Sequence, residues 1–456
     1  MLKVLYANKN LKETIMILTL PWGKDFLDIV VPEHWEIIIP AKAKTSNSSS
    51  CSEISIVKNS IMHPIGISPL DAFKLKGKKI LIIVDDNTRP TPVYRFIDVV
   101  VAELEKSGVA LEDIMLVPSL GIHTHMTEDE MIQKVGVSVI KKIKWQNHNA
   151  FDDDAHAFFG TTSRGTPVYL NKNIADAHFI ISIGMIEPHL WAGFGGGLKN
   201  ILPGLASAVT IGIHHEIIAH APQNFNSAGS IPEENSFRLD LEEIKNMIKK
   251  DIFSINIILD SDHNIIASFC GDPIKAHRAG VAFSYKTMGL PLKEKVDAII
   301  VNSFPMEINL KQSMKCIGNS LSALKPGGIV MGFLKADRGV DDVKLPDDAK
   351  PLWLVKRILR VIGPTRIRDF LDIIKKGLNV EEKFFTYYIM QLILQHDLYL
   401  YIPSLSDYEV KQLGYFKRCV RPEDVIAYGQ KKLKKNAKVA VFPEGGATFP
   451  ILGKTH

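Results

Sequence analysis

Short apolar runs alternate with amphipathic stretches along most of the chain. Residues 80–84, 179–181 and 298–301 are uninterrupted runs of Ile, Leu, Val, Phe and Ala, a pattern typical of strands that are buried on both faces of a parallel sheet. Residues 94–106 and 307–324 instead place apolar side chains at helical spacing, so each is predicted to be a helix. Because such strands and helices alternate, the pattern predicts an α/β protein.

Three of the predicted strands, within 76–93, 113–127 and 177–189, run directly into polar residues, and doubly wound sheets place their ligands at this end of the strands. A second unit begins near Pro291, where residues 296–333 read as strand, loop, helix, Pro-Gly-Gly turn and strand. Helical stretches follow up to residue 396, and residues 437–450 read as a last strand that enters a glycine loop. Residues 13–20 and 35–40 are β-like, and residues 41–53 form a Ser-rich loop.

We therefore predict two α/β domains with mainly parallel sheets and a cleft between them. Residues 1–289 would form the N-terminal, cofactor-binding catalytic domain. Residues 290–456 would form the C-terminal α/β domain, which contributes substrate-binding residues and whose last strand is free to return to the N-terminal domain.

The composition excludes several classes of protein. No apolar run approaches the roughly 20 residues that cross a bilayer, and the first ten residues lack a signal-peptide core. The four cysteines are scattered singly, unlike those of a zinc ribbon or a disulfide framework. The net charge of +5 comes without a basic block, which argues against nucleic acid as a partner. A cytoplasmic protein that binds small anions, with no membrane partner, fits these features.

Histidine is unevenly distributed, because nine of the fifteen histidines fall within residues 121–220. The densest constellation is GMIEPHLWAGFGGGLKNILPG at 184–204, which contains His189, three successive glycines and Lys199. The glycines suit either a phosphate-binding turn or a plain tight turn. Lys199 is either a solvated surface lysine or, if desolvated, a nucleophilic amine.

Two further histidine pairs lie near predicted helices. His123 and His125 precede Thr127, which is predicted to cap a helix with Glu130 as the partner of a capping box. His214 and His215 lie on a predicted helix, where adjacent side chains point about 100° apart, so at most one of them faces the same site as Lys199. The HExxH pattern of zinc metalloproteases is absent, which makes a histidine zinc site a minor alternative.

Five motifs together resemble the nickel-pincer lactate racemase family. They are DDNTRPTP at 85–92, GIHTHMTEDE at 121–130, PHLWAGFGGGLKNILPG at 188–204, the pair of histidines at 214–215, and FPMEINLKQSMK at 304–315. The resemblance covers roughly residues 15–340, with the motifs in the family's order and spacing. It implies an isomerase that inverts C2 of a 2-hydroxy acid, with a nickel-pincer nucleotide, pyridinium-3,5-bisthiocarboxylic acid mononucleotide nickel, as its cofactor.

The same resemblance implies a role for each matching residue. Lys199 resembles the lysine that holds the cofactor covalently, and His215 resembles the nickel ligand. His123 and His189 resemble the two acid/base histidines. Further residues near the cofactor would be Asp86, Thr88, Gly195, Gly196 and Gly197, and the substrate would be held by Arg89, Gln312 and Lys315, with Lys311 beside them.

The chemistry of inverting C2 of a 2-hydroxy acid independently requires a similar set of groups. The α-proton of a hydroxy acid anion is very weakly acidic, so hydride transfer through a flat 2-keto acid avoids a carbanion. One histidine then takes the proton of the hydroxyl group, and a second histidine donates a proton on the opposite face of the keto acid. Imidazole titrates near neutrality without much tuning.

Three positions depart from the family pattern. Gly195 stands where a serine is common, Lys311 where an aromatic residue is common, and His214 where asparagine is common. Lys311 and Lys315 are four apart, so on one continuous helix they would share a face and favour a dicarboxylic or polyhydroxylated substrate. The substrate itself stays open.

Two other functions remain as alternatives, a non-catalytic protein that binds a nucleotide or nickel cofactor and a metal-dependent hydrolase. The expected partners are a small 2-hydroxy acid and the proteins that make and insert the cofactor, and a homo-oligomer is compatible with the sequence.

Overall fold

The computed structural model describes residues 2–7, 13–40, 52–220, 225–341, 343, 345, 350–374 and 380–453. The chain forms two compact units. One contains residues 45–286, and the other combines residues 1–44 with residues 287–456. The predicted domain boundary at 289/290 lies close to the boundary at 286/287 in the structure. The structure groups the first 44 residues with the C-terminal part, unlike the prediction. The Ser-rich stretch predicted to be a loop lies almost wholly outside the described residues.

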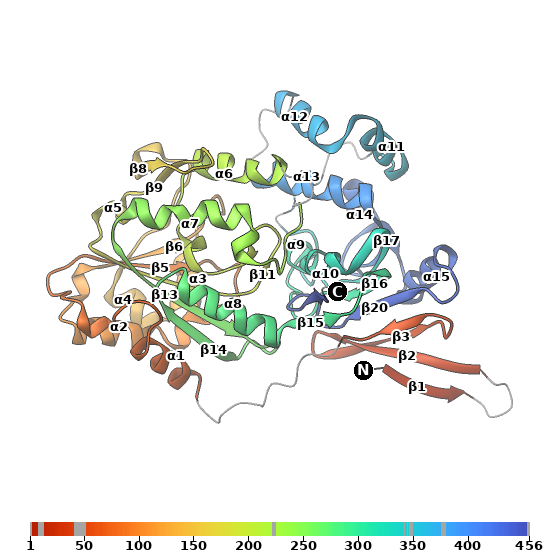
Figure 1. The fold of residues 1–456 in the computed structure, drawn as a ribbon, viewed down its shortest axis with the longest axis horizontal. Coiled ribbons are helices and arrows are strands. Elements are labelled where there is room, and N and C mark those ends of the chain that lie inside the picture. Colours follow the sequence, from red (N-terminus) through yellow and green to blue (C-terminus); the bar gives the residue numbers. More distant parts are fainter. Residues whose placement is uncertain are drawn as a thin grey trace. The chain divides into compact units, whose positions relative to one another are not determined.

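The unit of residues 45–286 is built on a six-stranded sheet (Figure 1). The order of its strands is β14-β13-β10-β5-β6-β7, and only β14 is antiparallel to its neighbour. The strands of this unit are β5 (Ile80–Asp85), β6 (Ile114–Ser119), β7 (Lys144–Trp145), β8 (His156–Thr161), β9 (Pro167–Asn171), β10 (Phe179–Met185), β11 (Pro188–His189), β12 (Gly193–Phe194), β13 (Asp251–Leu259) and β14 (Ile265–Gly271). Its helices are α1 (Glu53–Met62), α2 (Ile97–Lys106), α3 (Glu128–Val135), α4 (Val137–Lys142), α5 (Lys172–Asp176), α6 (Ala208–His220), α7 (Ser236–Ile248) and α8 (Lys275–Thr287).

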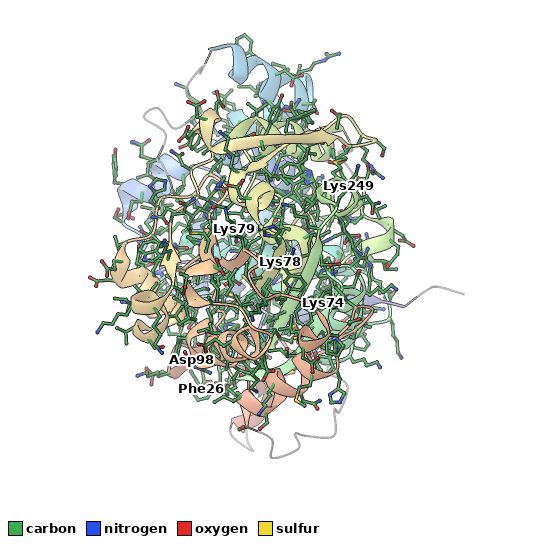
Figure 2. All side chains as sticks on the ribbon, turned by 90° about the vertical axis from the view of Figure 1, so that its left-hand side faces the viewer. Phe26, Lys74, Lys78, Lys79, Asp98 and Lys249 are labelled. Atoms are coloured by element: carbon green, nitrogen blue, oxygen red, sulfur yellow. The ribbon has the colours of Figure 1, made fainter. Side chains whose placement is uncertain are left out.

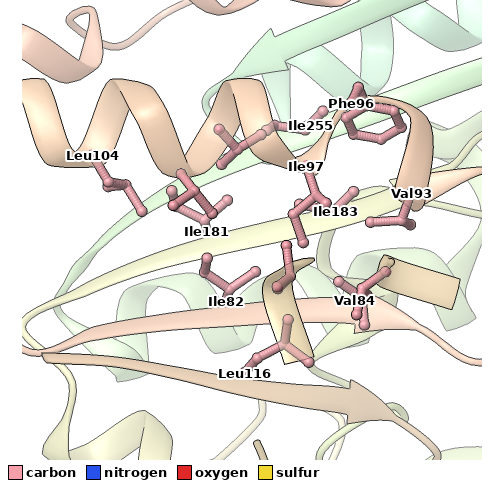
Figure 3. Close-up of a cluster of buried hydrophobic side chains, with 14 of the residues drawn as sticks. Ile82, Val84, Val93, Phe96, Ile97, Leu104, Leu116, Ile181, Ile183 and Ile255 are labelled. Atoms are coloured by element: carbon pink, nitrogen blue, oxygen red, sulfur yellow. The ribbon is translucent and has the colours of Figure 1, made fainter. Parts of the chain in front are cut away.

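The core of this unit lies between helix α2 and the sheet (Figure 3). Ile97 and Leu104 of α2 pack towards Ile82, Ile181 and Leu116 of three neighbouring strands. All of these side chains are buried, and burial of an aliphatic side chain contributes about 1.5–3 kcal/mol. The apolar runs recognised in the sequence therefore hold the sheet in place.

The chain order in this sheet creates a switch point. From β5 the chain proceeds outward through β6 to β7, and it then returns to the other side of β5 to form β10 and β13. The loops after β5 and β10 consequently diverge, and open α/β sheets bind ligands in the crevice between two such loops. The opposite, amino edge of the same strands carries exposed lysines, among them Lys78, Lys79 and Lys249 (Figure 2).

The second unit contains its own six-stranded, all-parallel sheet with the order β19-β18-β17-β16-β20-β4. Its strands are β1 (Leu2–Ala7), β2 (Glu13–Trp22), β3 (Asp25–Val31), β4 (Glu36–Ile38), β15 (Gly289–Leu292), β16 (Val296–Asn302), β17 (Leu324–Phe333), β18 (Asp397–Tyr401), β19 (Lys417–Cys419), β20 (Lys438–Phe442) and β21 (Phe449–Leu452). Its helices are α9 (Leu310–Ser313), α10 (Lys315–Ser320), α11 (Leu352–Ile362), α12 (Pro364–Ile374), α13 (Val380–Gln395), α14 (Asp407–Leu413) and α15 (Pro422–Lys432).

Both ends of the chain contribute to this second unit. Strand β4 pairs with β20 at the edge of the sheet, and the last strand, β21, pairs with β15. The last strand therefore stays with the C-terminal residues and does not join the sheet of residues 45–286. None of the described helices is long and apolar enough to span a lipid bilayer.

The single helix predicted over residues 307–324 is wrong. The structure contains two short helices, α9 and α10, separated at Met314, and a 3-10 turn at Leu321–Ala323. The backbone tightens at Met314, whose N–H lies close to the carbonyls of both Leu310 and Gln312. Lys311 and Lys315 therefore do not lie on one continuous helix, and a substrate role for Lys311 has to rest on its position beside Gln312 alone.

Candidate active site

The candidate site lies at the carboxyl edge of the sheet in residues 45–286, around the switch point between β5 and β10. The loop after β5 supplies residues 86–89, the loop after β6 supplies His123, and the segment after β10 supplies His189 and Lys199. The capping box predicted at the start of α3 is present, with Thr127 and Glu130 as its two members. It ends the loop that carries His123.

His123 is held by a carboxylate. Its Nδ1 lies 2.5 Å from Oδ2 of Asp86, and the hydroxyl of Thr88 donates to the other oxygen of Asp86 at 2.5 Å. Burial alone would raise the pKa of Asp86, but the hydrogen bond from His123 and the charges of His123 and Arg89 outweigh it, so this pKa lies well below its usual value. With Nδ1–H donated to Asp86, the ring presents Nε2 as its second nitrogen.

The neighbouring Asp85 has a structural partner instead. Its Oδ1 lies 2.6 Å from Nζ of Lys134, and Lys134 also donates to the carbonyl oxygens of Asp86 at 2.9 Å and Arg89 at 3.0 Å. Burial raises the pKa of Asp85 although Lys134 and Thr91 act in the opposite direction. Lys134 thus fixes the loop that carries Asp86 and Arg89, a role that no local sequence pattern indicates.

Arg89 is oriented by a buried acid from the next loop. Its Nε lies 3.1 Å from Oε1 of Glu187, and its Nη1 donates to the Thr88 hydroxyl at 3.0 Å. Glu187 is 4 % exposed, whereas the Arg89 side chain keeps 22 % of its surface accessible. The predicted substrate-binding arginine is therefore both anchored and accessible. Glu187 was inside a recognised motif, but only the contact reveals its role.

His189 and Lys199 contact each other directly. Nε2 of His189 lies 2.9 Å from Nζ of Lys199. The other ring nitrogen, Nδ1, accepts the backbone N–H of Trp191 at 3.3 Å and of Ala192 at 3.2 Å. The β11–β12 hairpin thus sets the ring orientation, and the 3-10 turn at Gly197–Asn200 places Lys199 against it.

The three glycines before Lys199 allow a close approach to the sheet. Gly196 and Gly197 have φ of +74° and +62°, a conformation that favours glycine. Two amide groups of the run are used inside the protein, since Gly195 N–H donates to Glu187 O at 2.7 Å and Gly197 N–H donates to Asn256 Oδ1 at 2.8 Å. The tight-turn interpretation therefore accounts for these two donors better than a phosphate-binding turn does.

A buried arginine binds the carbonyl side of the same loop. Arg238 on α7 is fully buried and donates to the carbonyls of Ala192, Phe194 and Gly196. His277 lies 2.9 Å from the Gly195 carbonyl through Nε2. Burial lowers the pKa of Arg238 to about 10 although Glu242 opposes the shift, so the guanidinium stays charged at neutral pH. No local sequence pattern singles out Arg238 or His277 as residues of this site.

The paired histidines of α6 have different surroundings. His215 is 7 % exposed, and its Nδ1 lies 2.7 Å from the carbonyl oxygen of Ile211. Donation of Nδ1–H to that oxygen leaves Nε2 as the nitrogen with a lone pair, which is the arrangement of a metal-binding histidine. His214 is completely buried, stacks on Phe237 and lies 3.4 Å from Asp240. The surroundings of His215 therefore suit a metal ligand better than those of His214, and its role as the nickel ligand stays a prediction.

The remaining predicted site residues lie in the other unit. Lys311 and Gln312 are on α9, and Lys315 begins α10. The Gln312 backbone N–H is capped by Asn309 at 2.9 Å, and its side-chain Oε1 is buried without a hydrogen-bond partner among the described residues. A buried side-chain carbonyl normally accepts a hydrogen bond, so Oε1 of Gln312 is available to a donor from a substrate or from water. Within the described part of the chain, no group of three His, Cys, Asp or Glu side chains is arranged to hold a metal ion.

Comparison with known proteins identifies the family. A profile described as the lactate racemase N-terminal domain matches residues 22–227. A lactate racemase of Thermoanaerobacterium thermosaccharolyticum is 30% identical over 316 residues, which cover 68% of this chain and 72% of that protein. The lactate racemase of Lactiplantibacillus plantarum is 27% identical over 400 residues, covering 86% and 90%.

Two solved structures share the fold. The lactate racemase apoprotein from T. thermosaccharolyticum superposes with a TM-score of 0.80 at 23% identity, covering 95% of this chain and 100% of that chain. A protein from Thermotoga maritima superposes with a TM-score of 0.62 at 17% identity, covering 90% and 100%. These two likenesses show the fold. The relative that is 30% identical over more than two thirds of both chains establishes that the chain belongs to the lactate racemase family and is an isomerase of the racemase type.

Proposed function

We propose that this chain racemises or epimerises C2 of a 2-hydroxy carboxylic acid by proton-coupled hydride transfer, through a 2-keto acid, with a nickel-pincer nucleotide as cofactor. The observation that carries the proposal is the pair of differently anchored histidines. His123 and His189 come from loops after two different strands at one sheet edge, each has its Nδ1 engaged by the protein, and Lys199 lies against the second.

The residues present fit the cofactor. His215 would supply one nickel ligand through Nε2, since its Nδ1 is held by Ile211 O, and Lys199 would hold the nucleotide covalently. Asp86 and Thr88 would lie near the nucleotide, and the glycines at 195–197 would let the chain pass close to it. When bound, this group accepts a hydride from the substrate carbon and returns it.

The two histidines would handle the hydroxyl proton. Nε2 of His123 takes that proton as the hydride leaves, and the Asp86 carboxylate stabilises the imidazolium that forms. His189 would serve the opposite face of the flat intermediate, where Nε2 gives or takes the proton. Racemisation requires both groups, because each enantiomer presents its hydroxyl hydrogen to a different side.

The substrate carboxylate would be bound by cations and an amide. Arg89, already oriented by Glu187, offers a guanidinium for a charge-assisted hydrogen bond. Gln312 and Lys315 are proposed to complete this set. Lys311 would add a further cation for a substrate with a second anionic or strongly polar group. A cytoplasmic location and the cofactor-insertion proteins also stay predictions.

One experiment tests the proposal directly. The chain is reconstituted with the cofactor, and lactate, malate and gluconate are each followed for loss of stereochemical purity at C2. We expect interconversion of at least one acid, a mass gain that Lys199→Ala abolishes, and nickel retention that His215→Ala lowers.

The histidine variants provide the controls. His123→Ala and His189→Ala should each lose on the order of 10²-fold in turnover or more, with nickel content near that of the parent. Lys311→Met should remove any preference for malate or gluconate over lactate. Interconversion at the parental rate in both histidine variants would refute the assignment of acid and base.

A further inference from the structure

The hydrogen bonds of His189 determine where its proton sits. Nδ1 accepts two backbone N–H groups, from Trp191 and Ala192, so this nitrogen carries a lone pair. A neutral imidazole has one N–H, and it must therefore be on Nε2. Since Nε2 lies 2.9 Å from Lys199 Nζ, the Nε2–H points at the lysine nitrogen.

The lysine must then be the acceptor of this hydrogen bond. An ammonium group has three donors and no acceptor, and two facing donors would repel each other. An uncharged amine has one lone pair and can accept the Nε2–H. We propose that His189 holds Lys199 as an uncharged, nucleophilic amine in the cofactor-free chain, so that His189 serves cofactor attachment as well as substrate turnover.

The inference rests on the proposed function, because it explains how Lys199 is made ready for its covalent role. The amine lone pair forms the bond to a thiocarboxyl carbon, the carbon–hydroxyl bond breaks, and water leaves with one of the two amine protons. Nothing is oxidised or reduced in this condensation. An ammonium group has no lone pair, so the charged form of Lys199 could not begin the step.

The backbone on both sides of the contact positions Lys199 against His189. The 3-10 turn at Gly197–Asn200 carries the lysine, and the amides of Trp191 and Ala192 hold the imidazole ring. Lys199 is only partly buried, which leaves it within reach of a small reagent. The described side chains thus offer a nucleophile that is both reactive and accessible.

The test measures amine reactivity in the cofactor-free protein. The chain is labelled with a trace of isotopic acetic anhydride at pH 7, and acetylation of each lysine is measured by peptide mass spectrometry. Lys76 is exposed, and Lys134 is buried and paired with Asp85, so they serve as internal references. An ordinary lysine is only about 0.04 % uncharged at pH 7, and we expect Lys199 to react at least about tenfold faster than Lys76.

Two variants test whether His189 is the cause of fast labelling at Lys199. His189→Glu and His189→Gln both keep an acceptor for the Trp191 and Ala192 amides, but each offers the lysine an oxygen that accepts from an ammonium group. Both should reduce labelling of Lys199 to the level of Lys76 or below, while His123→Gln leaves it fast. Labelling of Lys134 reports any loss of fold in a variant.

The outcome in the parent protein alone can overturn the inference. If Lys199 reacts no faster than Lys76 at pH 7 and shows the same dependence on pH, it is an ordinary ammonium group. If Lys199 is acetylated fast in the parent and equally fast in both His189 variants, a group other than His189 makes it reactive. Failure of the proposed function would look different, because the reconstituted chain would then gain no nucleotide mass even with a reactive lysine.

Discussion

Three acidic residues near the histidines have different tasks because their partners differ. Asp86 faces His123, Glu187 faces Arg89, and Asp85 is neutralised by Lys134. Each is nearly buried, and a buried carboxylate needs a cation or hydrogen-bond donors to remain charged. The residue-by-residue pairing therefore decides which groups stay available to a substrate.

Asp86→Asn tests the role of the carboxylate behind His123. The amide keeps the size of the side chain but removes the negative charge that stabilises an imidazolium and selects the Nδ1–H tautomer. We expect kcat to fall on the order of 10²-fold or more while nickel content and covalent cofactor stay unchanged. Turnover of both enantiomers by the reconstituted variant is the measurement, and Asp71→Asn, at an exposed aspartate of the same unit, is the control.

The pH dependence of kcat, compared between the parent and Asp86→Asn, provides a second measurement. Because the pKa of Asp86 lies well below its usual value, the carboxylate stays ionised throughout the range in which a histidine titrates. Protonation of Asp86 therefore does not contribute to a loss of activity between pH 8 and pH 5. A variant with parental kcat and an unchanged pH profile would show that Asp86 has no part in the proton transfer.

At the scale of elements, helix α7 and the hairpin before Lys199 depend on each other. Arg238 projects from α7 and binds three carbonyls of the segment 191–196, and the same segment supplies the Trp191 and Ala192 amides that orient His189. The buried guanidinium of Arg238 therefore connects helix α7 to the hairpin that positions His189, a candidate acid/base group.

Arg238→Met should destabilise the chain strongly. The substitution removes the hydrogen bonds that the buried guanidinium donates to the carbonyls of Ala192, Phe194 and Gly196. Hydrogen bonds from a charged group contribute about 1.5–3 kcal/mol each, so we expect a loss of about 3 kcal/mol or more. Glu242 keeps Arg278 as its cation. Arg238→Lys, which keeps one cationic donor, should lose less. Urea unfolding measures both, with Arg164→Met as the control, because Arg164 pairs with Glu243 at the surface and such pairs contribute about 1 kcal/mol at most. Equal losses for Arg238→Met and Arg164→Met would contradict the linkage.

The sequence predicted elements better than contacts. Strands β5, β6 and β10, helices α2 and α11 and the capping box at Thr127 all agree with their patterns, because apolar periodicity and caps are local properties. The helix over 307–324 failed because apolar spacing does not reveal the tightening at Met314. The sequence does not predict the roles of Lys134, Glu187 and Arg238, because the residues around a single charged side chain do not show which distant residue it contacts.

At the scale of the whole molecule, buried uncharged histidines make stability depend on pH. Burial lowers the pKa of His148 to about 4, and the pKa values of His214 and His277 lie well below the usual value for the same principal reason. In the unfolded chain these residues take up protons near pH 6.5. The unfolded state therefore binds more protons than the folded state below that pH, and folding stability falls with it.

We expect the free energy of unfolding to decrease as the pH is lowered from about 6.5 towards 4. His148 alone would contribute up to about 3 kcal/mol over that range, from a pKa difference of roughly 2.5 units. Urea unfolding at several pH values measures the slope, and His148→Gln should make it shallower below pH 6.5 while it leaves the slope above pH 7 unchanged. An identical slope in this variant would show that His148 does not carry the effect.

The interleaved chain path also fixes an order of events during synthesis. Strand β4 is synthesised before residues 45–286, yet its partner β20 begins only at Lys438. Residues 45–286 are complete long before that point, and domains generally fold as units while the chain is made. The unit of residues 45–286 can therefore fold while the edge strand at residues 36–38 is still unpaired. Translation must pass residue 438 before the second sheet can be completed, so a chain cut short before that residue would leave the edges of β16 and β4 unpaired.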